Sequence, residues 1–139
     1  MAFVLDASVA ISWCFPGDAA ENTAYSRRVL TELASNDAVV PEIWAFEIAN
    51  AIFVSCNKRN RITDQQVREY LDLLKALPIR VESQSLWANL DLESLARRQN
   101  LAAYDAAYVH LAQRTGFALA TPDQSLRAAA IASGISVLS

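Results

Sequence analysis

The first apolar segment of the chain ends in a carboxylate, and this feature constrains the fold most strongly. Residues 2–5 form an apolar run of mostly strand-favouring residues, and Asp6 follows at once. Such a run is typical of a buried strand in a parallel sheet, and α/β folds carry their functional groups at the carboxyl edge of that sheet. We therefore expect Asp6 to lie at a functional edge and to meet other oxygen ligands there.

Short apolar segments alternate with helical segments along the rest of the chain. Further strands are predicted at 38–40, 79–81, 117–121 and 135–138, and helices at 7–15, 18–34, 42–57, 63–77, 84–99, 102–114 and 123–132. This alternation calls for a mostly parallel sheet with helices on both faces. The 139 residues are 53% hydrophobic, which suffices for a sizeable core. The sequence predicts one α/β domain over residues 1–139, with a small sheet of four to five strands.

Composition excludes several classes of protein. Cys14, Cys56 and the single His110 have no zinc-binding spacing, so we expect two reduced cysteines in a cytoplasmic protein. No stretch is long enough to span a membrane, and no signal peptide precedes Asp6. The net charge of −3 argues against a protein that coats nucleic acid electrostatically. It leaves open a nuclease whose acidic site holds a cation.

Asp105 is the acidic residue least suited to its surroundings. It falls in the middle of an apolar helical stripe formed by Leu101, Tyr104, Tyr108, Leu111 and Ala112. A charged group on a buried face is costly unless it is paired or binds a cation. Both a structural ion pair or hydrogen-bonded core Asp and a metal ligand remain open for Asp105.

The predicted helix 42–57 carries polar residues between two apolar sides. Glu47 and Asn50 are three residues apart and share a face, where they either form a small polar site or border the solvent. The two apolar sides consist of Trp44, Ile48, Ala51 and Ile52, and of Phe46, Ala49, Phe53 and Cys56. One side can pack on the core, and the other suggests a partner.

Asp123 follows the predicted strand 117–121. An Asp just before a helix is most often an N-cap, and Asp6 could likewise be only a cap beside Ser8. The end of a strand is also the carboxyl edge of the sheet, so the capping and functional roles are compatible.

Asp6, Asp105 and Asp123 converge on one edge, where like charges are unfavourable without a counter-ion. A hard divalent cation with oxygen ligands, Mg²⁺ or Mn²⁺, solves this problem. Such a cation favours phosphodiester hydrolysis as the chemistry. No phosphate-binding glycine loop or serine-nucleophile elbow is present, and His110 lies on the polar side of its helix.

Four segments of the chain resemble the acidic blocks of a PIN domain. They are FVLDAS at 3–8, PEIWAFEIANA at 41–51, YDAAYVHLA at 104–112 and LATPD at 119–123. The length and layout are similar to the VapC toxins of prokaryotic toxin–antitoxin pairs. One departure is Pro122, which could shift Asp123.

The resemblance implies a PIN-like three-layer sandwich and a Mg²⁺- or Mn²⁺-dependent endoribonuclease acting on RNA of the tRNA or rRNA class. Asp6, Glu47, Asp105 and Asp123 would take the positions of the acidic quartet, with Asp6, Asp105 and Asp123 as metal ligands. The accompanying polar positions would be Ser8, Asn50 and Thr121. The resemblance also implies a homodimer and a cognate antitoxin that covers the acidic groove.

Three other functions are weighed against this one. A phosphatase with Asp6 as nucleophile usually has a second Asp two positions on, where this chain has Ser8. A response-regulator receiver needs a lysine in a late strand, which is missing. A non-catalytic PIN-like binding module is expected to have lost at least one of the four carboxylates.

Overall fold

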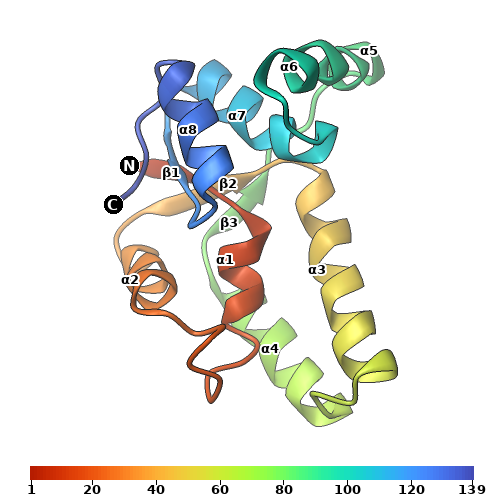
Figure 1. The fold of residues 1–139 in the computed structure, drawn as a ribbon. Coiled ribbons are helices and arrows are strands. Elements are labelled where there is room, and N and C mark those ends of the chain that lie inside the picture. The colour runs from red at the N-terminus through yellow and green to blue at the C-terminus, as the bar shows by residue number, and fades with distance from the viewer.

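The computed structural model describes residues 1–139, and its four strands form one parallel sheet. The strands are β1 (Ala2–Leu5), β2 (Asp37–Val40), β3 (Ile79–Val81) and β4 (Ala118–Ala120), in the order β3-β2-β1-β4. Helices connect them: α1 (Ala7–Ser12), α2 (Ala24–Glu32), α3 (Ile43–Phe53), α4 (Asp64–Ala76), α5 (Leu86–Leu90), α6 (Leu92–Gln99), α7 (Ala103–Thr115) and α8 (Gln124–Ala132). Figure 1 shows α1, α2 and α4 on one side of the sheet and α7 and α8 on the other. The predicted α/β class and parallel sheet are confirmed.

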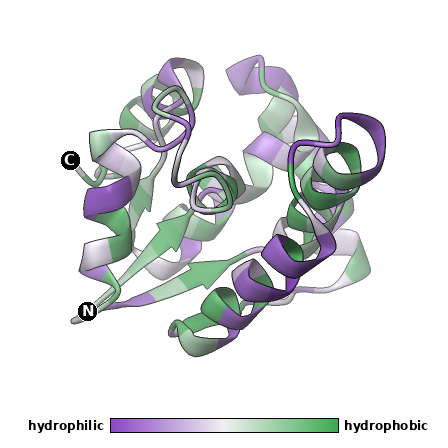
Figure 2. Cartoon of the chain, turned by 90° about the horizontal axis from the view of Figure 1, so that it is seen from below, coloured by the Kyte–Doolittle hydropathy of each residue, from purple (hydrophilic) through white to green (hydrophobic).

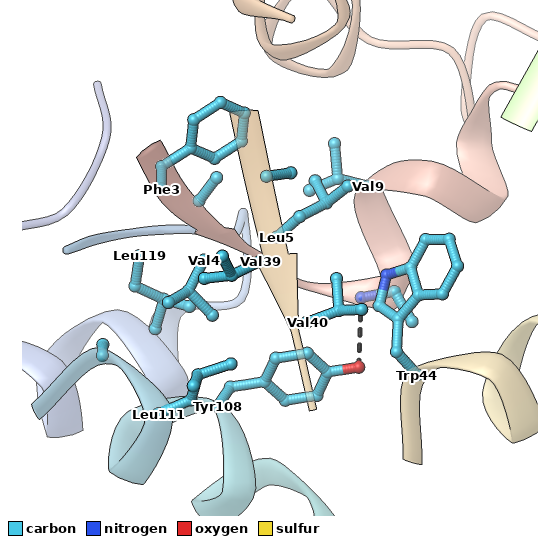
Figure 3. Packing of buried hydrophobic residues seen from close by; sticks show 14 of the residues in the cluster. Phe3, Val4, Leu5, Val9, Val39, Val40, Trp44, Tyr108, Leu111 and Leu119 are labelled. Atoms are coloured by element: carbon cyan, nitrogen blue, oxygen red, sulfur yellow. Dashed lines mark hydrogen bonds between the residues drawn. The ribbon is translucent and has the colours of Figure 1, made fainter. Parts of the chain in front are cut away.

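The core consists of apolar side chains that alternate between the two faces of the strands. Val4 pairs in register with Val39 of β2 and Leu119 of β4, and all three side chains are fully buried. They lie on the side of Leu111 and Tyr108 of α7 (Figure 3). Burial of each such side chain stabilises the fold by roughly 1.5–3 kcal/mol. Figure 2 shows that the strands inside the molecule are hydrophobic and that the outer helices carry hydrophilic stretches.

Several predicted elements have other bounds in the structure, and α1, expected to reach residue 15, ends at Ser12. The helix expected at 18–34 begins only after Thr23, whose side chain accepts a hydrogen bond from Ser26 N, while Asp18 pairs with Arg61 instead. The helix expected at 84–99 is interrupted at Asp91, which ends α5 and precedes α6. The strand expected at 135–138 is a single parallel bridge between Val137 and Leu119.

The helix expected at 42–57 has two parts. The α-helical part, α3, ends at Phe53, and a π-helical turn, η1 (Val54–Lys58), completes it. Its predicted division of faces holds, because Trp44 and Ile48 are buried whereas Phe46 and Phe53 remain exposed. No helix of the structure is long and apolar enough to cross a bilayer.

The strand order creates a switch point at the carboxyl edge of the sheet. The chain leaves β1 toward β2 and β3 on one side and later returns to pair β4 on the other side. Open α/β sheets bind ligands where neighbouring connections diverge in this way. The residues that follow β1 and β4, which include Asp6 and Thr121, therefore lie where such a fold is expected to bind a ligand.

Candidate functional site

Asp6 and Thr121 join the ends of the two adjacent strands. Asp6 is the N-cap of α1 and only 6% exposed, and Thr121 is fully buried. Asp6 Oδ2 accepts hydrogen bonds from Thr121 Oγ1 at 2.7 Å and from Ser8 Oγ at 2.9 Å. Asp6 Oδ1 accepts only the Ser8 backbone N–H, at 3.3 Å. The carboxylate is thus held in one orientation, with Oδ1 the less engaged oxygen.

Asp123 is attached to the same pair through Thr121. Thr121 Oγ1 accepts a hydrogen bond from the backbone N–H of Asp123 at 3.1 Å. Asp123 Oδ1 in turn accepts the Leu126 N–H at 3.0 Å, so the predicted capping role is confirmed. The other oxygen, Oδ2, has no hydrogen bond within the protein and lies on an exposed residue. Capping therefore leaves this carboxylate free to contact a ligand.

Glu47 is held by a buried tyrosine. The Tyr108 hydroxyl donates to Glu47 Oε1 at 2.6 Å. It also accepts the Ala7 N–H at 3.3 Å, the bond drawn as a dashed line at the Tyr108 oxygen in Figure 3. Burial, together with the neighbouring Glu47, raises the pKa of Tyr108 well above its ordinary value, so the phenol stays a proton donor. Tyr108 consequently links α7, α3 and the start of α1 at one point.

Burial also raises the pKa of Glu47. The hydrogen bond from Tyr108 opposes this effect, and the negative charges of Asp6 and Asp105 add to it. Glu47 therefore holds a proton more tightly than an ordinary carboxylate. Oε2 makes no hydrogen bond within the protein.

Asp105 is a half-buried carboxylate without a partner. It lies in the first turn of α7 and forms neither an ion pair nor a hydrogen bond. Burial raises its pKa, and the charges of Asp6 and Asp123 raise it further. The structural alternative considered for Asp105, an ion-paired or hydrogen-bonded core residue, therefore does not apply. Asp105 is an unpaired carboxylate that feels the negative charges of Asp6 and Asp123.

The four carboxylates influence one another electrostatically but do not form a complete set of metal ligands. The negative charge of Asp6 adds to the raised pKa of Glu47 and of Asp105, and the charge of Asp123 adds to that of Asp105. No three acidic, thiol or imidazole side chains are grouped closely enough to hold a metal ion. The donors still suit Mg²⁺ or Mn²⁺, because all are hard oxygens.

The two remaining predicted residues lie on the solvent side. Ser8 is exposed on α1 and bonded to Asp6, and Asn50 is exposed on α3 with no hydrogen bond within the protein. Asn50 and Glu47 both line an open hollow of about 420 Å³. The structure therefore brings Glu47 and Asn50 together, as their three-residue spacing suggested.

Sequence reasoning missed the role of Tyr108 and misplaced Tyr104. The apolar stripe predicts that Tyr108 is buried but not which group its hydroxyl contacts, although a buried tyrosine hydroxyl needs a partner, and that need is the available signal. Tyr104 was placed in the same stripe but is 56% exposed. It occupies the first turn of α7.

Comparison with known proteins gives a family match and similar folds. The PIN domain model matches residues 3–132. The crystal structure of PAE2754 from Pyrobaculum aerophilum has a TM-score of 0.66 at 19% identity, over 93% of this chain and 79% of that chain. The crystal structure of FitAcB from Neisseria gonorrhoeae has a TM-score of 0.64 at 17% identity, over 100% of this chain and 97% of that chain. No curated protein matches the sequence.

Proposed function

The chain belongs to the PIN-domain family, and we propose that it is a Mg²⁺- or Mn²⁺-dependent endoribonuclease that serves as the toxin of a toxin–antitoxin pair. The observation that carries the proposal is Asp105, a half-buried carboxylate with no partner, whose pKa is raised by burial and further by the charges of Asp6 and Asp123. An arrangement of this kind is costly in an ordinary fold and becomes favourable when a cation is bound.

In this proposal Asp6, Asp105 and Asp123 hold the cation. Each offers at least one oxygen that is free or only weakly engaged within the protein. A bound divalent cation would lower the pKa of a coordinated water and stabilise negative charge on a phosphate. Ser8 and Thr121 orient the Asp6 carboxylate through the bonds described above.

Glu47 is proposed to accept the proton of the attacking water. Its raised pKa makes it a better proton acceptor than an ordinary carboxylate. Tyr108 fixes one of its oxygens and leaves the other free. Asn50, exposed one turn along α3, is positioned to contact the substrate beside Glu47.

The resemblance to VapC toxins supports the proposed partners. These are RNA of the tRNA or rRNA class, a cognate antitoxin and a second copy of the chain. On the exposed apolar side of α3, Ala49 and Phe53 are consistent with a protein partner.

Two other functions yield different results in a direct comparison. We expect Mg²⁺ or Mn²⁺ to raise the melting temperature of the protein and to support hydrolysis of single-stranded RNA but not of p-nitrophenyl phosphate. A metal-stabilised protein that hydrolyses only the phosphate monoester is a phosphatase. A protein that binds RNA, hydrolyses neither substrate and gains no stability from either cation is a binding module.

The Tyr108→Phe variant tests how Glu47 is positioned. Without the hydroxyl, Glu47 loses its only hydrogen bond and the Ala7 N–H loses its acceptor. We expect roughly 10-fold slower RNA cleavage and a stability loss of about 1–2 kcal/mol. A double-mutant cycle checks whether Tyr108 acts through Glu47. In the Glu47→Gln background, adding Tyr108→Phe should slow cleavage little further, because the Glu47 carboxylate that Tyr108 positions is already absent.

Tyr70→Phe is the matched control for that variant. Tyr70 is also buried, and its hydroxyl donates to the Ala10 carbonyl oxygen at 2.5 Å, away from the carboxylates. This substitution should lower stability while leaving cleavage by the folded protein unchanged. Equal losses of cleavage in both variants would show that Tyr108 acts only through stability.

A further inference from the structure

Two open hollows meet beside Glu47. The first, of about 420 Å³, contains Glu47 and Asn50. The second, of about 410 Å³, lies between α3, α7 and the residues of α5 and α6 that face them. Both are lined by the same three side chains, which are Ile43, Phe46 and Tyr104. These side chains therefore form the boundary between two adjoining spaces at the candidate site.

Phe46 and Tyr104 present their rings to solvent at this boundary. Phe46 is 71% exposed and Tyr104 is 56% exposed. Each directly precedes a candidate catalytic carboxylate, Glu47 and Asp105 respectively. The two other exposed aromatic residues are Phe53 of α3, at 50%, and Trp87 of α5, at 72%, and they line neither hollow. The two exposed rings are thus placed beside the candidate chemistry.

The charge of the hollows limits what can occupy them. No lysine or arginine lines either one, whereas Glu47 lines the first and Glu42 the second. A phosphate would be repelled there, but a neutral planar group would not. Nucleobases are neutral and planar, and proteins bind unpaired bases by stacking them on aromatic side chains. Asn50, which has no hydrogen bond within the protein, can contact the edge of such a base.

We propose that Phe46 and Tyr104 form a stacking platform for unpaired bases of the RNA strand that flank the cleaved phosphate. The inference rests on the proposed ribonuclease function and makes it more specific, because the cleaved segment must be single-stranded. A base within a duplex is already stacked on both sides and cannot reach these rings. In this arrangement the phosphates contact the cation at the carboxylates, and the bases occupy the two hollows.

Binding of an abasic strand tests this proposal directly. The probes are a fluorescent uridine oligonucleotide and an abasic ribose-phosphate strand of equal length, measured by anisotropy with Mg²⁺ on the cleavage-deficient Asp105→Asn protein. We expect the uridine strand to bind on the order of 10-fold more tightly than the abasic strand. Adding Phe46→Leu and Tyr104→Leu should abolish that preference, because leucine keeps an apolar side chain but removes the ring. Tyr104→Phe, which keeps the ring, should preserve it.

Trp87→Leu is the control, since it removes an equally exposed ring outside both hollows. An unchanged preference for bases in the Phe46→Leu/Tyr104→Leu protein overturns the proposal. So does equal binding of the uridine strand and the abasic strand by the Asp105→Asn protein, which would show that the rings do not contact bases. Binding requires no cleavage, so failure of this proposal is distinguishable from failure of the nuclease function, which wild-type hydrolysis of RNA reports separately.

Discussion

We expect the Asp105→Asn variant to lose RNA cleavage by a factor of about 100 or more while remaining folded. The Asp105 carboxylate has no partner within the protein, so removing its charge breaks no ion pair or hydrogen bond that holds the fold. Loss of one metal ligand removes several kcal/mol of transition-state stabilisation, which corresponds to this factor or a larger one. Cleavage rates of purified wild type and variant at equal cation concentration measure the effect.

The same substitution is expected to stabilise the metal-free protein at neutral pH. Because the pKa of Asp105 is raised in the folded state, the folded protein binds this proton more tightly than the unfolded chain does. The carboxylate therefore destabilises the fold at pH values above its folded pKa, and this penalty disappears as the pH falls through that value. Asp105→Asn should raise the melting temperature in EDTA by on the order of 2 °C at neutral pH and less in acid.

Asp91→Asn provides the charge-matched control for Asp105→Asn. Asp91 is exposed between α5 and α6, and its side chain makes no capping hydrogen bond. It should change neither cleavage nor the pH dependence of melting. A lower melting temperature for Asp105→Asn in EDTA would contradict the account of Asp105 as an unpaired carboxylate.

Asp6→Asn is expected to abolish cleavage and also to destabilise the protein. Charge removal alone predicts a gain in stability for both Asn variants, but Asp6 accepts bonds from the Ser8 N–H, the Ser8 hydroxyl and the Thr121 hydroxyl. An amide nitrogen in place of Oδ2 cannot accept from the two hydroxyls. We expect a loss of roughly 1 kcal/mol, or about 3–5 °C in melting temperature, in EDTA.

Thr121→Val tests whether that loss arises from the bond between the two strand ends. It removes the Thr121 hydroxyl from Asp6 and keeps the side-chain shape. The combined Asp6→Asn/Thr121→Val variant should be less destabilised than the sum of the single variants, because both remove the same contact. Full additivity, or a higher melting temperature for Asp6→Asn, would show that repulsion dominates at Asp6.

The parts of the site that follow directly from a strand were predictable from sequence. The apolar run before Asp6 and the segment before Thr121 place both residues at the same sheet edge, because neighbouring parallel strands end together. The cap at Asp123 followed from local rules for helix starts. These inferences need no knowledge of distant contacts.

The remaining parts depend on tertiary contacts that periodicity does not encode. The bond between Tyr108 and Glu47 joins residues 61 positions apart. The stripe on α7 identified Tyr108 as buried, but it could not show which acid its hydroxyl would reach. The same stripe predicts Tyr104 in the core, whereas this residue, in the first turn of α7, is exposed.

The failed strand at 135–138 has a similar origin. Its apolar residues suit a strand, and Leu138 N donates to Leu119 O as a fifth strand would. Gly134, with a positive φ, ends the turn after α8, and only Val137 comes into register with β4. The residue types of the segment favour a strand, but the turn that precedes it limits its pairing with β4 to one bridge.

The most direct test of the central claim is incubation of the purified protein, free of bound partners, with total bacterial RNA. Wild type and Asp105→Asn are compared in Mg²⁺, in Mn²⁺ and in EDTA. The account predicts discrete RNA fragments from wild type with either cation, and none in EDTA or from the variant. Fragments that persist in EDTA or with Asp105→Asn, or intact RNA under both cations, would contradict it.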